Sequence, residues 1–470
     1  MDANERAKKH KKERFVAWVI TLIILAVVAA GIFFVVSRYG STIARTVKDA
    51  VKSPEPVAEE TTEEEQTPEE TEPSPEDKAM DEDSLNAIFD KEEDTVSEDT
   101  VSQPDAARSE DDELTLKAKE LVEAMTTEQK VAQIFFVEPE SLTDVDVATA
   151  AGEKTRVALT ERPVGGIIFF AKNIESPDQI KQMNANLQRY SNEIVKVPMF
   201  TGIDEEGGSV VRIEGNESFE GEDSPVKKVD TMEKLGSGGD EKAAYEAALT
   251  IGTYLKEYGF NLDLAPVADV SVEGRKNALG DRIFSSDPKV VAGMVSSYLA
   301  GLHDARVLGA VKHFPGIGGI EKDLHNSAGT IEEDWDALLE RELVPFSRAI
   351  DEDVKFIMVS HASLPGLTGD EIPASLSGII LTQKLRMEMG YKGVIITDAM
   401  NMKAITESHD SAEAAVTSIK AGADMILMPE DFEKAYEGVL DAVSSGELSE
   451  ERIAESAERI VRAKLILVND

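Results

Sequence analysis

Two histidines lie close together on a glycine-rich segment, VKHFPGIGGIEKDLHNSAG, that runs from Val311 to Gly329. The chain has six histidines, so this pairing is a candidate for chemistry. His325 can accept and release a proton near neutral pH, and Asp323 could orient its imidazole through a hydrogen bond. Such a pair suits a reaction that protonates a leaving oxygen and later deprotonates water. The alternative is a loop histidine with an incidental acidic neighbour.

A second candidate is Asp398, which follows the apolar run GVIIT. A carboxylate held at the end of a buried strand could attack the anomeric carbon of a sugar and form a covalent glycosyl-enzyme. Taken alone, Asp398 could equally be a structural turn residue. Together with His325 it would supply the two groups that cleavage of a glycosidic bond requires.

A zinc site is the competing interpretation of the same residues, since Asp323, His325, His313 and His361 are all possible ligands. No HExxH-like spacing supports such a site, and Lys312 would lie unfavourably beside a cation. We therefore expect no metal and no organic cofactor. The chain also lacks cysteine, which excludes disulfides, Cys-based zinc sites and a cysteine nucleophile.

The elements that must position these residues alternate regularly from Leu114 onward. Stretches of helical period, such as 177–194, 287–305 and 410–424, separate short apolar runs that read as strands. Strands alternating with helices indicate a parallel sheet, and eight pairs favour a (β/α)8 barrel of the TIM type over an open, doubly wound sheet, the alternative. The eight runs cover residues 131–137, 165–170, 197–203, 260–266, 308–314, 354–360, 392–398 and 423–429.

Polar residues follow several of these runs directly. Asp204, Lys312 with His313, His361 and Asp398 all lie at carboxyl ends of predicted strands. In a barrel these ends share one rim, where active sites form. Ser176 and Asp287, each followed by proline, are predicted to cap the amino ends of two helices.

The first 113 residues have a different composition. Residues 1–14 form a basic tail, and residues 15–37 are uncharged and apolar, long enough to span a bilayer core of about 30 Å as a helix. The basic tail predicts a cytoplasmic N-terminus and an extracellular catalytic domain. A cleaved signal peptide is the alternative.

Residues 38–113 read as an acidic linker. Positions 53–113 hold twenty-five Asp and Glu against three Lys and Arg, and apolar residues are scarce, so this linker is expected to be disordered. It is interpreted as a spacer, with a binding tail for a basic partner as the alternative. Residues 114–470 form the predicted single catalytic domain. The net charge of −42 argues against a nucleic-acid partner.

Six motifs in order resemble the signatures of glycoside hydrolase family 3, most closely its β-N-acetylhexosaminidase branch, over about residues 125–470. The motifs are DEEGGSVVR, GFNLDLAPVADV, GDRIFSSDP, VKHFPGIGGIEKDLH, PASLS and GVIITDAMNM. The resemblance implies that Asp398 is the nucleophile and that His325 with Asp323 forms an acid/base dyad. It also implies that glycines in the segment let the acid/base loop fold over the sugar, at Gly316, Gly318 and Gly319. Sugar-binding positions implied by the resemblance are Asp204, Arg212, Arg282, Lys312 and His313.

Three residues depart from the family pattern. Ile317 stands where a polar residue is frequent, Leu324 where a small one is usual, and Glu205 where glutamine is common. Family members that act as β-glucosidases or β-xylosidases usually take their acid/base from a C-terminal domain. No such domain follows the barrel here, so a dyad within the barrel favours the hexosaminidase branch.

The sequence thus predicts a membrane-anchored, monomeric glycosidase: a retaining exo-β-N-acetylglucosaminidase whose substrates are peptidoglycan-derived fragments. Two other functions stay open. A histidine acid/base carries no negative charge, so phosphate could replace water as acceptor in a phosphorylase. A non-catalytic protein that binds the cell wall could also retain the barrel.

Overall fold

The computed structural model describes residues 110–321, 324 and 329–469. The predicted segments 1–14 and 15–37, and the linker 38–113 up to residue 109, lie outside these residues, as do Asp323 and His325. Within the described part of the chain, no helix combines the length and apolar character needed to cross a bilayer.

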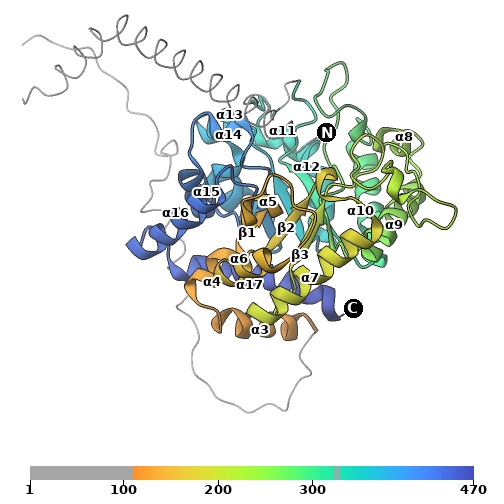
Figure 1. Cartoon of the computed structure of the whole chain (residues 1–470). Coiled ribbons are helices and arrows are strands. Elements are labelled where there is room, and N and C mark those ends of the chain that lie inside the picture. The colour runs from red at the N-terminus through yellow and green to blue at the C-terminus, as the bar shows by residue number, and fades with distance from the viewer. Residues whose placement is uncertain (1–109, 322–323, 325–328, 470) are drawn as a thin grey trace, which may run out of the picture. The chain divides into compact units, whose positions relative to one another are not determined.

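Eight parallel strands form the centre of the catalytic unit, with helices around them (Figure 1). Each strand from β1 to β6 pairs with the next in the chain, and β8 pairs with β1. The strands are β1 (Phe135–Val137), β2 (Gly166–Phe169), β3 (Phe200–Ile203), β4 (Leu262–Asp263), β5 (Leu308–Phe314), β6 (Phe356–Val359), β7 (Val394–Thr397) and β8 (Ile426–Leu427).

The sheet closes between β7 and β8. A parallel bridge joins Ile396 to Met425, and the Thr397 N–H donates to the Met425 carbonyl at 3.0 Å. The predicted (β/α)8 barrel is therefore confirmed, and the open, doubly wound alternative is wrong. Every predicted run contains a strand. Residues 131–133 are an exception within the first run, because they end the helix α4 (Thr127–Gln133), whose capping box starts at Thr126.

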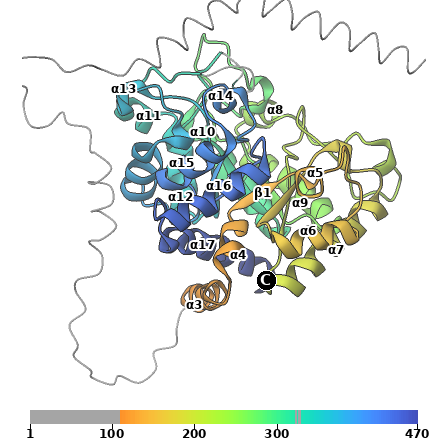
Figure 2. The same ribbon diagram turned by 60° about the vertical axis from the view of Figure 1, so that its left-hand side comes forward.

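Helices fill the intervals between strands. Ser176 and Asp287 cap α7 and α10 as predicted, with the Ser176 hydroxyl accepting from the Gln179 N–H at 3.3 Å. Figure 2 shows the same helices from a second direction. Those between β1 and β4 are α5 (Pro139–Thr143), α6 (Glu153–Glu161), α7 (Pro177–Val195), α8 (Met232–Ser237) and α9 (Glu241–Glu257). Those between β4 and β6 are α10 (Pro288–Asp304), α11 (Trp335–Glu340) and α12 (Leu343–Asp351). The remainder are α13 (Pro365–Thr368), the π-helical η5 (Ile379–Glu388), α14 (Lys403–Thr406), α15 (Ser411–Ala421), α16 (Phe432–Ser445) and α17 (Glu450–Asn469), and α3 (Glu110–Glu123) precedes the barrel.

Large side chains fill the barrel interior. A Cβ added at Gly166 of β2 would lie 2.7 Å from the Phe136 ring, and one added at Gly202 of β3 would lie 2.3 Å from it. Both strands therefore need glycine at these positions. Nearer the amino ends of the strands, Phe200 packs edge-on against Phe356, with ring centroids 5.1 Å apart. This filled interior makes the barrel a core rather than a pore.

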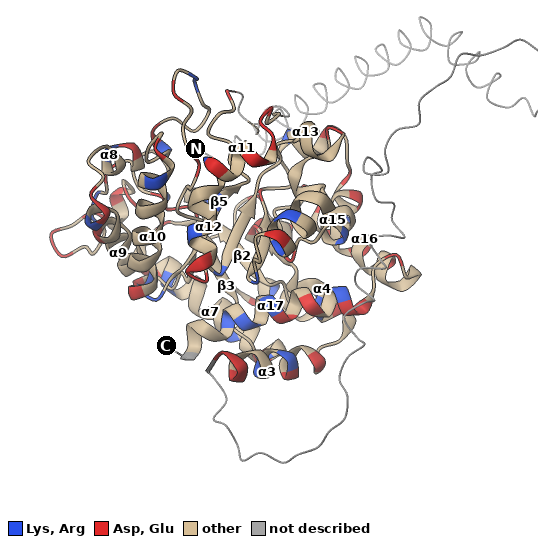
Figure 3. Ribbon diagram, turned by 180° about the vertical axis from the view of Figure 1, so that it is seen from behind, with Lys and Arg blue, Asp and Glu red and all other residues tan. Residues whose placement is uncertain are grey.

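The helices α3 and α17 pack together at the amino ends of the strands. Val195 and Val197, which precede β3, lie in the same apolar cluster as Ala118 of α3 and Val461 of α17. Acidic and basic residues alternate along α3, α4 and α17 in Figure 3. Because α3 and α17 lie at the amino ends of the strands, the carboxyl ends form the opposite rim.

Candidate active site

Four charged residues from strand β5 and from the segments after β3 and β4 meet at the carboxyl rim. The Lys312 ammonium, near the end of β5, donates to Asp204 Oδ1 at 2.9 Å and lies 2.6 Å from Glu206 Oε1. Arg282 binds both oxygens of Glu206 at 2.8 Å. Lys312 and Glu206 are buried, whereas the Asp204 side chain is 19% exposed. Asp204 and Arg282, whose side chain is 20% exposed, therefore form the accessible part of this charge cluster.

Glu206 stays ionised within this cluster. Burial opposes its ionisation, but the positive charges of Lys312 and Arg282 outweigh burial and lower the Glu206 pKa to about 2. Arg212 joins the cluster from the same loop, with its guanidinium 3.6 Å from Asp204 Oδ2 and 5.4 Å from the centre of the Phe170 ring. The rim thus offers a carboxylate flanked by cations, which can bind neighbouring hydroxyls through charge-assisted hydrogen bonds.

A second carboxylate shapes the loop after β3. Glu205 is buried and accepts hydrogen bonds from the N–H groups of Arg212, Ile213 and Glu214 and from the Tyr254 hydroxyl. The loop held in this way carries Asp204, Glu206 and Arg212 into the charge cluster. Glutamine, which is common here in the family, has one side-chain oxygen and would accept fewer of these hydrogen bonds. The glutamate at position 205 therefore stabilises the loop.

Asp263, at the end of β4, lies beneath the cluster. It accepts from the Glu205 N–H at 3.0 Å, and its Oδ2 has no hydrogen-bond partner among the described residues. Burial raises the Asp263 pKa well above its ordinary value, and the neighbouring Glu205 adds to this. The raised pKa favours the neutral form of Asp263, which would add no negative charge beneath Asp204 and Glu206.

His313 follows Lys312 through a cis peptide bond and is held by Asp269. Asp269 Oδ2 lies 2.7 Å from His313 Nδ1 and accepts from the His313 backbone N–H at 3.1 Å. Its other oxygen accepts from the Ile317 N–H at 2.6 Å. Asp269 is fully buried. One carboxylate therefore holds both His313 and the first turn of the glycine-rich segment.

The glycines of that segment are required by close contacts. A Cβ at Gly318 would stand 2.1 Å from the Val270 carbonyl oxygen, and one at Gly316, where φ is +114°, would stand 2.6 Å from Glu342 Cβ. Packing against neighbouring loops thus demands glycine at both positions, in addition to any role in loop movement.

Asp398 lies at the same rim, directly after β7. Its N–H donates to the Val359 carbonyl of β6 at 2.8 Å, and its Oδ1 accepts from the Ala399 N–H at 2.8 Å. His361 Nε2 lies 3.0 Å from the Ala399 carbonyl, which must be the acceptor, and His361 Nδ1 lies 2.7 Å from the Ser375 hydroxyl. His361 therefore fastens the backbone beside Asp398.

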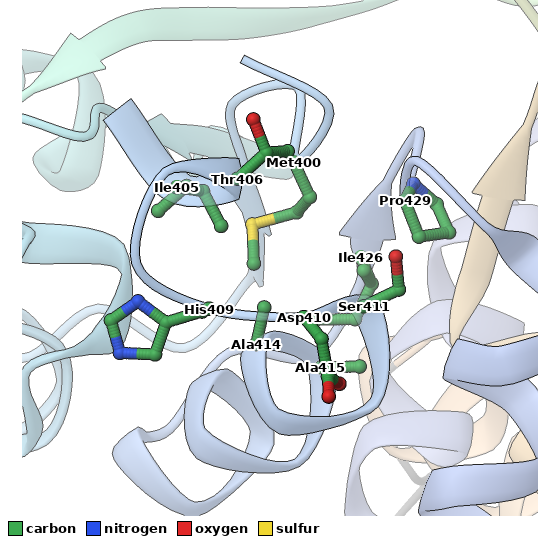
Figure 4. Close-up of a pocket in the computed structure, with 10 residues that line it drawn as sticks. All are labelled: Met400, Ile405, Thr406, His409, Asp410, Ser411, Ala414, Ala415, Ile426 and Pro429. Carbon is green, nitrogen blue, oxygen red and sulfur yellow. The ribbon is translucent and has the colours of Figure 1, made fainter. Parts of the chain in front are cut away.

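The loop that carries Asp398 rests on an apolar base (Figure 4). Met400 points into the middle of this group, while His409 lies at its edge. Met400, Ile405 and Ile426 are buried, and the hollow they line leaves no room for a ligand. This base fixes the loop from behind.

Comparison with known proteins supports what this geometry suggests. Residues 126–463 match the model for the glycosyl hydrolase family 3 N-terminal domain. The chain belongs to glycoside hydrolase family 3. It is 32% identical to β-hexosaminidase A of Pseudoalteromonas piscicida, over 64% of this chain and 53% of that protein, so it spans about half of this relative. It is 30% identical to a β-hexosaminidase of Nitrosomonas eutropha, over 62% of this chain and 82% of that protein.

A solved structure agrees with both relatives. A family 3 β-N-acetylglucosaminidase from Paenibacillus sp. str. FPU-7 superposes with a TM-score of 0.68 and 35% identity, over 73% of this chain and 63% of that one. The predicted family and its hexosaminidase branch are thereby confirmed.

The structure brings together the predicted sugar-binding residues of this family 3 chain. Arg212 and Lys312 each contact Asp204, Arg282 and Lys312 both bind Glu206, and His313 follows Lys312 in the chain. The predicted dyad, Asp323 and His325, lies outside the described residues, so its role stays a prediction.

Three supporting residues were not singled out from the sequence, namely Glu206, Asp263 and Asp269. Glu206 and Asp269 lie within three residues after a predicted strand, which is a signal that could have marked them, whereas Asp263 lies inside the predicted run 260–266 and ends the observed β4. No group of three or more His, Cys, Asp or Glu in residues 110–321, 324 and 329–469 could hold a metal ion.

Proposed function

We propose that this chain is a retaining exo-β-N-acetylglucosaminidase. The observation that carries the proposal is one rim that holds both the Asp398 carboxylate and the Asp204–Lys312–Arg212 group. A carboxylate nucleophile next to a hydroxyl-binding group is what a retaining glycosidase requires. The similarity to a family 3 β-N-acetylglucosaminidase supports N-acetylglucosamine as the sugar.

The reaction would proceed in two displacements. Asp398 attacks the anomeric carbon as the bond to the leaving oxygen breaks, and His325 donates its proton to that oxygen. Water then attacks the same carbon, His325 takes the proton from water, and the Asp398 carboxylate leaves. Asp323 would orient His325 in both steps. Asp204, Arg212, Arg282, Lys312 and His313 would bind the sugar hydroxyls.

The proposal extends to location and substrate on the basis of composition. Residues 15–37 would anchor the protein in the cell membrane with its N-terminus in the cytoplasm, and residues 38–113 would separate the anchor from the barrel. A monomeric catalytic domain outside the cell would meet peptidoglycan-derived fragments that carry terminal N-acetyl-β-glucosamine.

The test replaces the nucleophile. Asp398→Ala is expected to abolish hydrolysis of an aryl N-acetyl-β-glucosaminide while circular dichroism stays unchanged, and the exposed Asp351→Ala serves as the control. Full activity of Asp398→Ala would refute the assignment. Parallel reactions with and without phosphate distinguish a phosphorylase, which would release sugar 1-phosphate. Sugar binding without turnover in the wild type would favour a non-catalytic protein.

A further inference from the structure

We propose that Asp269 is a positioning residue that sets the tautomer of His313 and the start of the segment leading to His325. The kinetic part of this proposal rests on the proposed function. The tautomer part does not.

The contacts of Asp269 define its task. It comes from the loop after β4, is fully buried, and accepts three hydrogen bonds from two positions of the β5 segment. A carboxylate can only accept these bonds, so His313 must carry a proton on Nδ1. His313 Nε2 is then left to accept a hydrogen bond from a sugar hydroxyl, or to donate one if the ring is protonated.

The same contacts tie two backbone segments together. Residue 267 forms a parallel bridge with Lys312, and the Ala268 N–H donates to the Lys312 carbonyl at 2.6 Å. Further along, a Cβ at Gly318 would meet the Val270 carbonyl. The β4 loop therefore runs beside the β5 segment from Lys312 to Gly318, and Asp269 stands in the middle of this contact.

Asparagine at this position separates positioning from simple packing. Asp269→Asn keeps the shape but replaces one acceptor oxygen with an NH₂ group. If NH₂ faces His313, it meets the backbone N–H and forces the ring proton to Nε2. If NH₂ faces Ile317, two donors oppose each other at the start of the segment. In either orientation, one set of hydrogen bonds is disrupted, either the set to His313 or the one to Ile317.

The direct measurement is long-range ¹H–¹⁵N NMR of the full-length chain labelled with ¹⁵N at histidine and isoleucine, with His313 assigned from the signal lost in His313→Gln. The wild type is expected to show the proton on Nδ1 of His313. Asp269→Glu should keep this tautomer, because it keeps a carboxylate, whereas Asp269→Asn should move the proton to Nε2 or shift the Ile317 amide signal. A wild-type His313 protonated only on Nε2 would overturn the proposal, and this outcome needs neither a variant nor glycosidase activity.

The kinetic measurement compares two leaving groups. A phenyl N-acetyl-β-glucosaminide needs protonation of its leaving oxygen, whereas a 2,4-dinitrophenyl glycoside scarcely does. We expect Asp269→Asn to lower kcat/KM about 100-fold on the first substrate and about tenfold on the second, since acid catalysis typically contributes about 100-fold or more. Asp269→Glu should recover part of the loss.

Asp424→Asn is the matched control, because Asp424 is also fully buried and accepts a backbone N–H, from Ile395, but belongs to an arginine cluster at β8. It should lower stability and reduce kcat/KM equally on both substrates. Equal losses on both substrates in Asp269→Asn, with an unchanged His313 tautomer and Ile317 signal, would show that Asp269 has only a packing role.

Discussion

At the scale of single residues, the rim depends on a carboxylate that the ligand need not touch. Glu206 is 1% exposed and binds Lys312 and Arg282 at the same time. Since its pKa is lowered to about 2, its ionisation contributes stability that is present above its unfolded pKa near 4.5 and is lost as the pH falls toward 2. Both cations therefore keep a fixed position throughout the physiological range.

Replacing Glu206 should expose this dependence. Glu206→Gln leaves the buried Lys312 and the half-buried Arg282 with a neutral partner, and breaking a buried ion pair in this way costs about 3–5 kcal/mol. We expect that loss in urea denaturation at pH 7, a kcat/KM lowered about 100-fold because the sugar-binding cations shift, and a weaker fall in stability between pH 4.5 and 2.

Glu257→Gln is the control for this experiment. Glu257 pairs with Lys181 at 2.9 Å on the surface, and exposed pairs contribute at most about 1 kcal/mol. A Glu206→Gln protein as stable and active as this control would contradict the role given to Glu206.

At the scale of elements, loops are held by close backbone contacts. Gly318→Ala should displace the segment after β5, because its Cβ would stand 2.1 Å from a carbonyl oxygen that cannot move freely. Misplacing a catalytic segment by about 1 Å can cost about 100-fold in rate, so kcat should fall by roughly that factor. Gly366→Ala, in α13 with nothing within 4 Å of the new Cβ, should leave kcat unchanged. Equal kcat values for the two variants would refute the packing argument.

The helix α17 carries a second test. Lys464 is fully buried, donates to Gln133 Oε1 at 2.7 Å, and lies 5.2 Å from the Phe200 ring centre. Burial lowers its pKa from 10.5 to about 7. Between these values the unfolded chain binds a proton that the folded chain has released, so the free energy of unfolding should rise with pH from about 7 to 10.

Lys464→Met should remove that rise. Urea denaturation at several pH values between 7 and 10 measures the slope, and Lys242→Met, at an exposed position, provides the control. Parallel curves for Lys464→Met and the wild type would mean that Lys464 keeps its proton in the folded state.

Elements also show which features can be predicted from sequence. The eight strands were predictable because short apolar runs alternate with stretches of helical period, and the caps of α7 and α10 followed from Ser-Pro and Asp-Pro. The helical start of the first run was missed because VAQ is apolar enough for either structure, and the capping box at Thr126 decides for the helix. The partnership of Asp269 with His313 was not predictable, because it depends on which loops meet after the barrel closes.

At the scale of the whole molecule, the anchor remains the main proposal. Deleting residues 1–37 should move the protein from the membrane fraction to the soluble fraction, and kcat and KM on an aryl glycoside should stay within about twofold, since the barrel keeps its core. Fractionation followed by immunodetection provides the measurement. Retention of the shortened chain on membranes would show that another segment binds them.

The packing of α3 against α17 has a practical consequence. The first described helix, α3, begins at Glu110, and the last, α17, ends at Asn469. Asp111 and Ile466 line the same groove near the starts of β5 and β6. Both covalent attachment points thus lie at the pole away from Asp204 and Asp398. A surface, a bead or a fused protein joined at either point would leave the catalytic opening accessible to bulky polymers.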